Sequence, residues 1–428
     1  VAVAASLAVV CLLLLRVGEF GVLRHALGGW ETGLGIALQA DALSVGLLLM
    51  SALVATGVGV YAGGYFADAA MQGRFWPLWL LLLTALNALL LSGDLFNLYV
   101  TLELLRLSAV ALAALGGSAP ALRAALRYLI LGLLGSLAFL AGVALVYARY
   151  GTLDLASLAG LVGPEPAAWV ALALMTTGLL IKSALFPLHF WLPSAHANAP
   201  APVSAALSAL VVKAAFYLLL RLWLELFYPA ATAAAAWLLG FLGAGAVVWG
   251  SWNALRVERL KLLAAYSTVA QLGYLFLFFP LLSALPPGAA RETAFGALVL
   301  LALTHGFAKS ALFLAAGVIL QRAGHDRIAD LGGTARALPV TTFTLALAGV
   351  ALIGLPPSGS FLAKWQLLSA AIAGGQWLWV PVVVAGTLLS AAYVFRLLGH
   401  AFGTGDRTTP VLAHGGEELP ALLLALTA

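Results

Sequence analysis

The chain is a succession of apolar runs, most of them long enough to cross a lipid bilayer. A membrane-spanning helix needs about 20 predominantly apolar residues. Hydrophobic residues make up 63% of the sequence and charged residues 9%, whereas a soluble domain is roughly 25% charged. The sequence therefore predicts an all-α polytopic membrane protein that is surrounded by lipid. The runs lie near residues 1–15, 41–65, 75–93, 95–115, 125–148, 168–190, 202–226, 231–252, 260–284, 294–320, 338–372 and 377–402.

Basic residues are distributed unevenly among the loops. Loops that follow even-numbered runs hold about eleven Lys and Arg residues and the other loops about five, so the positive-inside rule places the first set in the cytoplasm. The net charge of +5 reflects this asymmetry and not a nucleic-acid partner, because the basic residues are scattered singly. The single cysteine, Cys11, excludes a disulfide, a cysteine-ligated iron–sulfur cluster and a thiolate zinc site within this chain. We therefore expect no metal, no cofactor and no redox centre in this chain.

Two of the runs are interrupted. Pro187 breaks the run T-G-L-L-I-K-S-A-L-F-P-L-H-F-W-L-P, and Pro356, Pro357 and Gly359 break the run I-G-L-P-P-S-G-S-F-L-A-K-W. Broken helices at bilayer depth are tolerated only where the freed backbone groups are buried in protein or face water. Paired breaks in two halves of a chain point to a transport site in an inverted repeat.

The two breaks are so far apart in the sequence that each falls in its own half of the chain, and this predicts two repeats of five spans each. An odd number of spans makes the two repeats inverted relative to one another. The sequence starts without a methionine and ends in a short apolar stretch, so we expect it to be cut at both ends. The predicted parts are N-terminal transmembrane helices at 1–70, a first repeat at 75–226, a second at 231–402 and the start of a C-terminal helix at 403–428.

Ionisable side chains inside the runs are candidate functional residues, because a charge at the centre of an inserting helix costs about 2.5–3.5 kcal/mol. Glu103 lies near the middle of its run, and Asp94 at the start of that run is predicted to cap the helix. Arg106 follows Glu103 at i,i+3 spacing, so the two form either a local ion pair or a modulated charge-coupling site.

The other buried candidates suit a proton relay. Lys182 and Lys213 have apolar residues on both sides, so neither reaches the membrane surface easily. His305 and Lys309 lie at i,i+4 on one helix face, and Lys364 follows the second break. Histidine titrates near neutrality and is suited to passing protons between lysines. Arg396, nearer the end of a run, is a further candidate.

Five ordered motifs resemble those of the antiporter-like proton-translocating membrane subunits. This superfamily includes the A and D subunits of Mrp-type antiporters, the antiporter-like subunits of respiratory complex I (NADH-quinone oxidoreductase) and those of membrane-bound hydrogenases. The phrase G-D-L-F-N-L-Y is most similar to the Mrp D subunit. The motifs are G-D-L-F-N-L-Y-V-T-L-E-L, K-S-A-L-F-P-L-H-F-W-L-P-S-A-H with P-A-P-V-S-A-A-L-S-A-L-V-V-K, R-L-K-L-L-A-A-Y-S-T-V-A-Q-L-G-Y, H-G-F-A-K-S-A-L-F-L-A-A-G and P-P-S-G-S-F-L-A-K-W.

The resemblance implies a bundle of fourteen helices, of which about 12–13 are visible here. Each of two inverted five-helix repeats would form a half-channel around a lysine on a broken helix. Arg106 departs from the family, in which a hydrophobic residue is usual at that position. By motif, Glu103 corresponds to the charge-coupling glutamate, Lys182 to its lysine, Lys213, His305 and Lys309 to relay residues, and Lys364 to the terminal lysine.

The function implied by this resemblance is proton translocation in a multisubunit Na⁺/H⁺ antiporter, in the place of the Mrp D subunit. H⁺, Na⁺ and other subunits would be the partners, and the inner membrane of a prokaryote the location. A proton-pumping subunit of complex I or of a related membrane-bound hydrogenase is the alternative, so whether the chain is part of an enzyme depends on its partners. A structural subunit with static buried ion pairs is the third interpretation. No catalytic set of residues near a membrane surface supports a membrane enzyme.

Overall fold

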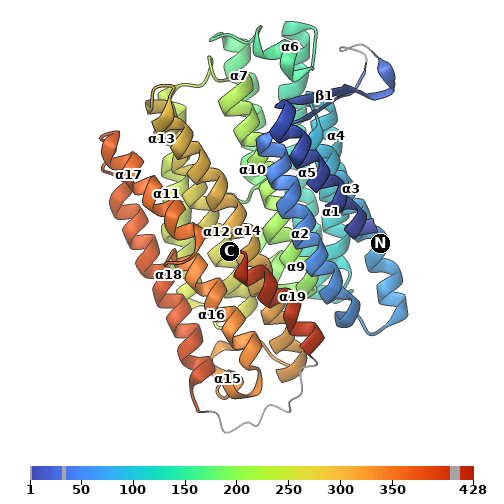
Figure 1. The fold of residues 1–428 in the computed structure, drawn as a ribbon, viewed down its shortest axis with the longest axis vertical. Coiled ribbons are helices and arrows are strands. Elements are labelled where there is room, and N and C mark those ends of the chain that lie inside the picture. The colour runs from blue at the N-terminus through green and yellow to red at the C-terminus, as the bar shows by residue number, and fades with distance from the viewer. Residues whose placement is uncertain (1, 31–34, 405–414) are drawn as a thin grey trace. The chain divides into compact units, whose positions relative to one another are not determined.

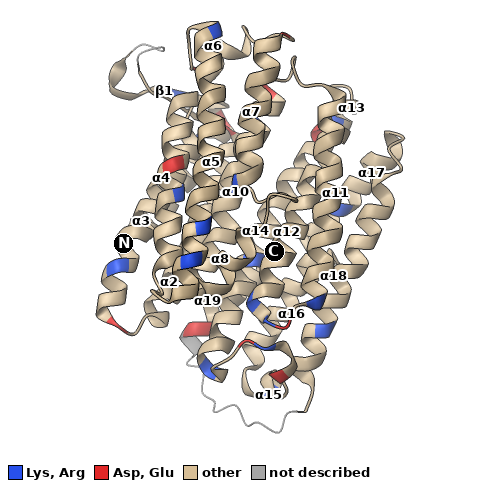
Figure 2. Ribbon diagram, turned by 180° about the vertical axis from the view of Figure 1, so that it is seen from behind, with Lys and Arg blue, Asp and Glu red and all other residues tan. Residues whose placement is uncertain are grey.

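A computed structural model describes residues 2–30, 35–404 and 415–428, and most of these residues are helical. Ten helical segments in the described part of the chain are long and apolar enough to cross a membrane. Figure 2 shows long stretches of these helices without a single charged residue. On α5, the side chains of Leu126, Ile130 and Leu137 are more than half exposed, as expected of a surface that faces lipid. The all-α membrane fold predicted from composition is confirmed.

The described chain divides into two compact units. Unit 1 comprises residues 1–55, 73–184 and 210–232, and unit 2 comprises 56–72, 185–209 and 233–428. The predicted repeats are sequence segments and these units are sets of packed residues, so the repeat boundaries stay a prediction.

Unit 1 consists of helices and one small hairpin, in which β1 and β2 are antiparallel with Leu23 opposite Ala40. Helix α5 packs against α4 and α7, and α7 packs against α10. The elements are α1 (Ala2–Phe20), β1 (Leu23–Ala26), η1 (Leu27–Gly29), β2 (Ala37–Ala40), the first part of α2 (Ala42–Tyr65), most of α3 (Ala69–Leu91), α4 (Leu95–Ala114), α5 (Ala119–Tyr150), α6 (Leu155–Ala159), α7 (Pro166–Lys182), α10 (Val212–Arg221) and the π-helical turn η3 (Leu222–Leu226).

Unit 2 is built around α14, which packs against α12, α16, α17 and α19 (Figure 1). Helix α18 packs against α11 and α16. The elements are α8 (Leu192–Asn198), α9 (Ala201–Ala206), the π-helical turn η2 (Leu207–Val211, shared with unit 1), α11 (Ala233–Arg256), α12 (Leu260–Phe276), α13 (Phe278–Ala284), α14 (Ala289–Ala323), η4 (Ile328–Asp330), α15 (Thr334–Ala337), α16 (Pro339–Ile353), α17 (Gly359–Ala373), α18 (Trp379–Phe402) and α19 (Gly415–Leu426).

Both interrupted runs are broken helices, as expected. Helix α7 ends at Lys182, and the chain around Pro187 is not helical before α8 begins. The run 338–372 divides into α16 and α17, and Pro356 and Pro357 lie in the gap between them. Gly359 is the first residue of α17. Each break therefore leaves helix ends, whose backbone groups lack helical hydrogen-bond partners, inside an apolar run.

Closely packed helices contact through paired glycines in each unit. A Cβ atom on Gly178 of α7 would collide with the backbone of Gly135 on α5. In unit 2, a Cβ on Gly273 of α12 would likewise collide with the backbone of Gly243 on α11. Small residues at these crossings allow the helix backbones to approach, which supports helix association in lipid. The α5–α7 contact brings the end of α7, and hence Lys182, close to α5.

Candidate functional site

Glu103 is the centre of a buried ionic cluster in unit 1. It lies in the middle of α4, which begins after Asp94, whose side chain accepts a hydrogen bond of 2.8 Å from the Asn97 backbone N–H. The predicted helix cap at Asp94 is thus confirmed. The Glu103 side chain is 16% exposed. A carboxylate at this depth is stable only with hydrogen-bonding or charged partners.

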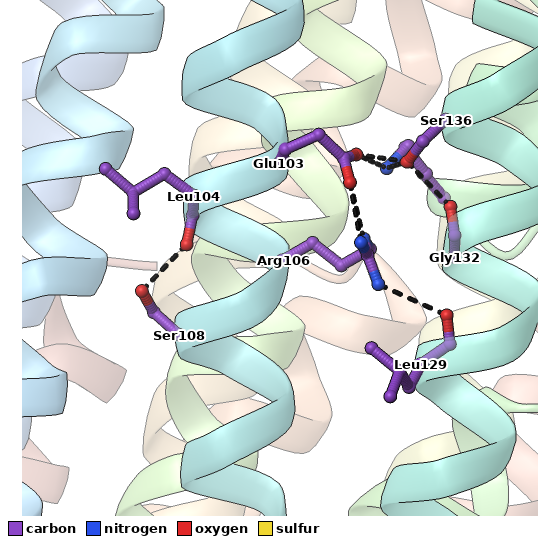
Figure 3. A network of polar contacts seen from close by, with 8 residues as sticks. Glu103, Leu104, Arg106, Ser108, Leu129, Gly132 and Ser136 are labelled. Carbon is purple, nitrogen blue, oxygen red and sulfur yellow. Dashed lines mark hydrogen bonds and ion pairs between the residues drawn. The ribbon is translucent and has the colours of Figure 1, made fainter.

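Two cations share the Glu103 carboxylate. Arg106 Nη2 lies 2.6 Å from Oε2, and Arg106 Nε lies 3.2 Å from the same oxygen (Figure 3). Lys182 Nζ lies 2.8 Å from the other oxygen, Oε1. The local ion pair and the pair between distant helices, which the sequence presents as competing, therefore form at the same time.

Ser136 of α5 joins this cluster. Lys182 Nζ donates to its hydroxyl oxygen at 2.7 Å, and the hydroxyl contacts Oε1 of Glu103. The same hydroxyl lies 2.8 Å from the carbonyl oxygen of Gly132. One hydroxyl proton serves one acceptor at a time. Ser136 can therefore turn its proton toward the carboxylate or away from it, depending on where the lysine lies.

Helix α5 also contacts the side chain of Arg106. Arg106 Nη1 donates to the Leu129 carbonyl oxygen at 3.1 Å. A Cβ atom on Gly132 would collide with Cδ of Arg106, so glycine at this position makes room for the arginine. The Arg106 side chain is only 6% exposed. Arg106 is thus an integrated part of the cluster.

Lys213 lies in α10 and is 2% exposed. The π-helical turn η2 ends two residues before it, and η3 follows at the end of α10. Single π-helical turns inside α-helices occur frequently at functional sites. No pattern in the sequence indicates these turns.

In unit 2, Lys309 of α14 reaches toward α12. Its Nζ donates to the Ala264 carbonyl oxygen at 3.0 Å and contacts the hydroxyl of Ser267. His305 lies one turn earlier on α14 and is 2% exposed. Polar contacts continue from α14 to α17, because the hydroxyls of Thr304 and Ser360 are 2.9 Å apart.

The second helix break holds Lys364. Its Nζ donates to the carbonyl oxygens of Leu352 at 3.2 Å and Ile353 at 3.0 Å. These are the last residues of α16, whose carbonyls lack helical partners. Nζ also lies 4.2 Å from the centroid of the Tyr274 ring. Gly354 has a φ of 82°, and a Cβ there would collide with Cδ of the lysine, so the break needs glycine on both grounds.

A groove of about 190 Å³ lies beside Lys364, between α17 and α18. Its walls are mostly apolar and include Trp365 and Leu388, which are 61% and 65% exposed. Lys364 itself is 4% exposed. Lys364 is therefore close to the outer surface of unit 2, although its ammonium group is covered.

Several residues of these sites are not predicted from the sequence. Ser136 is a small polar residue in an apolar run, and nothing in the sequence marks it as functional. Tyr274 lies in one of the motifs that resemble the family, but the resemblance assigns it no role. Lys261 has the position of a loop residue, yet it lies in α12, is 2% exposed and contacts the Ala199 carbonyl. Arg396, considered as an intramembrane charge, donates to the carbonyls of Leu255 and Val257 at the end of α11.

A comparison with known protein families shows to which family this chain belongs. The family model of the NADH:quinone oxidoreductase/Mrp antiporter transmembrane region matches residues 92–390. The chain belongs to this family. The matched region contains Glu103, Lys364 and both helix breaks.

Relatives come from more than one kind of membrane complex. The chain is 38% identical over 417 residues to NADH-quinone oxidoreductase subunit N of Desulforudis audaxviator, covering 94% of this chain and 81% of the relative. It is 28% identical over 400 residues to the D subunit of the Na⁺/H⁺ antiporter of Bacillus subtilis, covering 92% and 79%. A chain of the archaeal membrane-bound sulfane sulfur reductase, a respiratory membrane complex, superimposes with a TM-score of 0.90 and 29% identity, covering 99% and 86%. The resemblance inferred from the motifs is confirmed.

Proposed function

We propose that this chain is the proton-translocating membrane subunit of a multisubunit Na⁺/H⁺ antiporter, equivalent to the D subunit of the Mrp type. The observation that carries the proposal is the contact of Lys182 with Glu103 at the end of a broken helix, with an Nζ–Oε1 distance of 2.8 Å. In this proposal Glu103 sets how firmly Lys182 holds its proton. Lys213, His305 and Lys309 pass protons on, and Lys364 is the terminal group.

The electrostatic energy between Lys182 and Glu103 is similar in size to the energy of moving one charge across a membrane potential, and coupling of the two processes requires this similarity. At an effective dielectric constant of about 20, a pair of unit charges gains roughly 4 kcal/mol at 4 Å and about 2 kcal/mol at 8 Å. Moving Lys182 a few ångströms from Glu103 therefore changes its hold on a proton by about 2 kcal/mol. Moving one charge through 100 mV is worth roughly 2.3 kcal/mol. A small motion at the break can thus exchange energy with an ion gradient.

A proton-pumping role in a redox-driven complex is the second candidate. It is favoured by the 38% identity to a subunit N of NADH-quinone oxidoreductase. In either case the chain works with other subunits, because its relatives are named as subunits of larger complexes. The cell membrane of a prokaryote is the location that fits, since these relatives are bacterial and the solved complex is archaeal.

The test uses the complete complex in sealed vesicles. Lys182→Ala and Lys364→Ala are each expected to abolish the change in internal pH that follows the driving reaction, measured with a pH-sensitive dye. Arg149→Gln, which alters an exposed ion pair with Glu165 in unit 1, is the control and should leave transport intact. Intact transport in both lysine variants would overturn the proposal.

The same experiment separates the remaining alternatives. If the buried charges only support assembly, the lysine variants will lower the amount of complex without changing transport per assembled complex. A driving Na⁺ gradient distinguishes the antiporter from the redox-driven complex, which responds to an electron donor instead.

A further inference from the structure

A second buried ionic cluster lies in unit 1, around Arg221 at the end of α10. Its Nη2 lies 2.6 Å from Oδ1 of Asp41, the residue that precedes α2. Its Nη1 lies 2.5 Å from Oε1 of Glu225, which lies in η3. The Arg221 side chain is 6% exposed, whereas the Glu225 side chain is 48% exposed. A buried arginine therefore lies one turn before a carboxylate that meets the surface.

The polar residues of α10 and η3 form a column. Lys213, Tyr217, Arg221 and Glu225 recur every four residues, which brings such side chains to one helix face. Arg221 Nε donates to the Tyr217 hydroxyl at 3.0 Å, and that hydroxyl donates to the Leu90 carbonyl oxygen at 2.9 Å. Hydrogen bonds and an ion pair thus link Tyr217, Arg221 and the exposed Glu225, and Lys213 lies one helical turn before Tyr217.

Arginine interrupts this column chemically. A guanidinium stays protonated in proteins, so it does not pass a proton on, unlike lysine, tyrosine or a carboxylate. Its fixed positive charge also repels an approaching proton or cation. Burial by itself raises the pKa of Asp41, but the charge and hydrogen bond of Arg221, together with hydrogen bonds from Ser44 and Gln39, lower this pKa overall. The carboxylate that holds the arginine is therefore ionised at neutral pH.

The backbone at Glu225 is not regular α-helix. Residues Leu222–Leu226 form a π-helical turn, and the Phe227 N–H donates to the Leu222 carbonyl at 2.7 Å. Conversion of such a turn to α-helix rotates the side chains that it carries, and π-helical turns occur frequently at functional sites. A change at η3 would move Glu225 relative to Arg221.

We propose that Arg221, held by Asp41 and Glu225, is a gate that keeps water and protons from reaching Tyr217 and Lys213 from the Glu225 end of α10. Release of the arginine opens this end. The inference rests on the proposed function in treating Lys213 as a relay residue. Arg221 is a positioning residue, because it acts by controlling access to the relay.

Passive proton leak through the intact complex, in vesicles without substrate or electron donor, tests this gate. An imposed pH gradient is expected to collapse about tenfold faster in Arg221→Gln, because the fixed charge and its ion pairs are lost. Arg221→Lys keeps the charge and should restore most of the barrier. The double variant Arg221→Gln with Tyr217→Phe should leak less than Arg221→Gln alone, since the hydroxyl is the next group inward.

Controls distinguish the gate from a structural tether. Arg149→Gln should not change the leak, because Arg149 forms an exposed ion pair with Glu165 that is separate from the Arg221 cluster. If Arg221→Gln prevents assembly, Glu225→Gln removes only the half-exposed carboxylate and should give an intermediate leak. A native leak rate per assembled complex in either variant overturns the gate. Because passive leak needs no driving reaction, the leak measurement can support or contradict the gate whatever the transport activity of Lys182→Ala is.

Discussion

Lys182 and Lys364 both lie beside a helix break, yet different chemistry holds each ammonium group. Lys182 is paired with the Glu103 carboxylate, which comes from another helix. Lys364 is held by the carbonyl oxygens of its own broken helix and by the face of Tyr274. Within the described part of the chain, Lys364 has no ion pair. Relative motion of helices can therefore change the charge environment of Lys182, whereas that of Lys364 changes when the break itself moves.

The largest difference between the two sites should appear when a single charge is removed. Glu103→Gln leaves Lys182 and Arg106 as two buried cations without their carboxylate, so we expect a loss of about 3–5 kcal/mol in stability. Lys364→Met removes a buried charge without stranding a carboxylate, so its effect on stability should be close to neutral. Thermal unfolding of the purified complex measures both. Equal destabilisation by the two variants would contradict this view of the sites.

Arg106 is a second cation at the Glu103 site, and Lys364 has no such neighbour in its ion-pair contacts within the described residues. It occupies one oxygen of Glu103 and leaves the other to Lys182. Arg106→Leu removes the competing cation, so the coupling free energy between Glu103 and Lys182 should rise by about 1–2 kcal/mol. A double-mutant cycle on these two residues, measured in the native and Arg106→Leu backgrounds, gives this quantity. Arg106→Lys keeps the charge and is the control, and an unchanged coupling energy in the leucine background would refute the idea.

The aromatic contact of Lys364 has a smaller expected effect. A cation over an aromatic face contributes about 0.5–2 kcal/mol. Tyr274→Phe keeps the ring and should leave proton transport nearly unchanged, whereas Tyr274→Leu should slow it severalfold. Initial rates of vesicle acidification compare the two. Similar rates in both variants would show that the ring face does not stabilise the ammonium group.

The smallest effects should come from the serines that contact Lys182 and Lys309. Ser136 accepts a hydrogen bond from Lys182 in unit 1, and Ser267 contacts Lys309 in unit 2. Ser136→Ala leaves the ion pair with Glu103 in place, so we expect a loss of about 1 kcal/mol in the free energy of unfolding, measured by thermal unfolding. Ser267→Ala removes a polar partner from a lysine that also donates to the Ala264 carbonyl, and a similar loss is expected. If Ser136→Ala lowers the free energy of unfolding as much as Glu103→Gln does, the hydroxyl and not the carboxylate is the main stabilising partner of Lys182.

Much of the fold is predictable because lipid imposes a simple rule. Backbone polar groups must be satisfied within each span, so long apolar runs are helices. The breaks at Pro187 and at Pro356–Pro357 follow from residues that cannot continue a helix. The candidate residues Glu103, Lys182 and Lys364 stand out because charges are costly in such runs.

The partners of these charges are not predictable in the same way. Arg221 and Lys261 lie near the ends of their runs, where basic residues are normally exposed, so the sequence does not single them out. Burial of both side chains depends on residues far away in the chain, such as Asp41 for Arg221 and Ala199 for Lys261. Local sequence patterns do not contain contacts of this kind.

Hydrophobicity and helix-breaking residues act locally, so the amino-acid sequence is sufficient to predict a bundle of membrane helices with two breaks and a set of buried charges. The partner of each charge follows only from the way in which the helices pack. Lys182 reaches Glu103 because α5 packs against both α4 and α7, and the glycines Gly135 and Gly178 allow α7 to approach α5 closely. Such an approach is set by packing between helices, and the energy of a buried charge depends on atoms within a few ångströms of it.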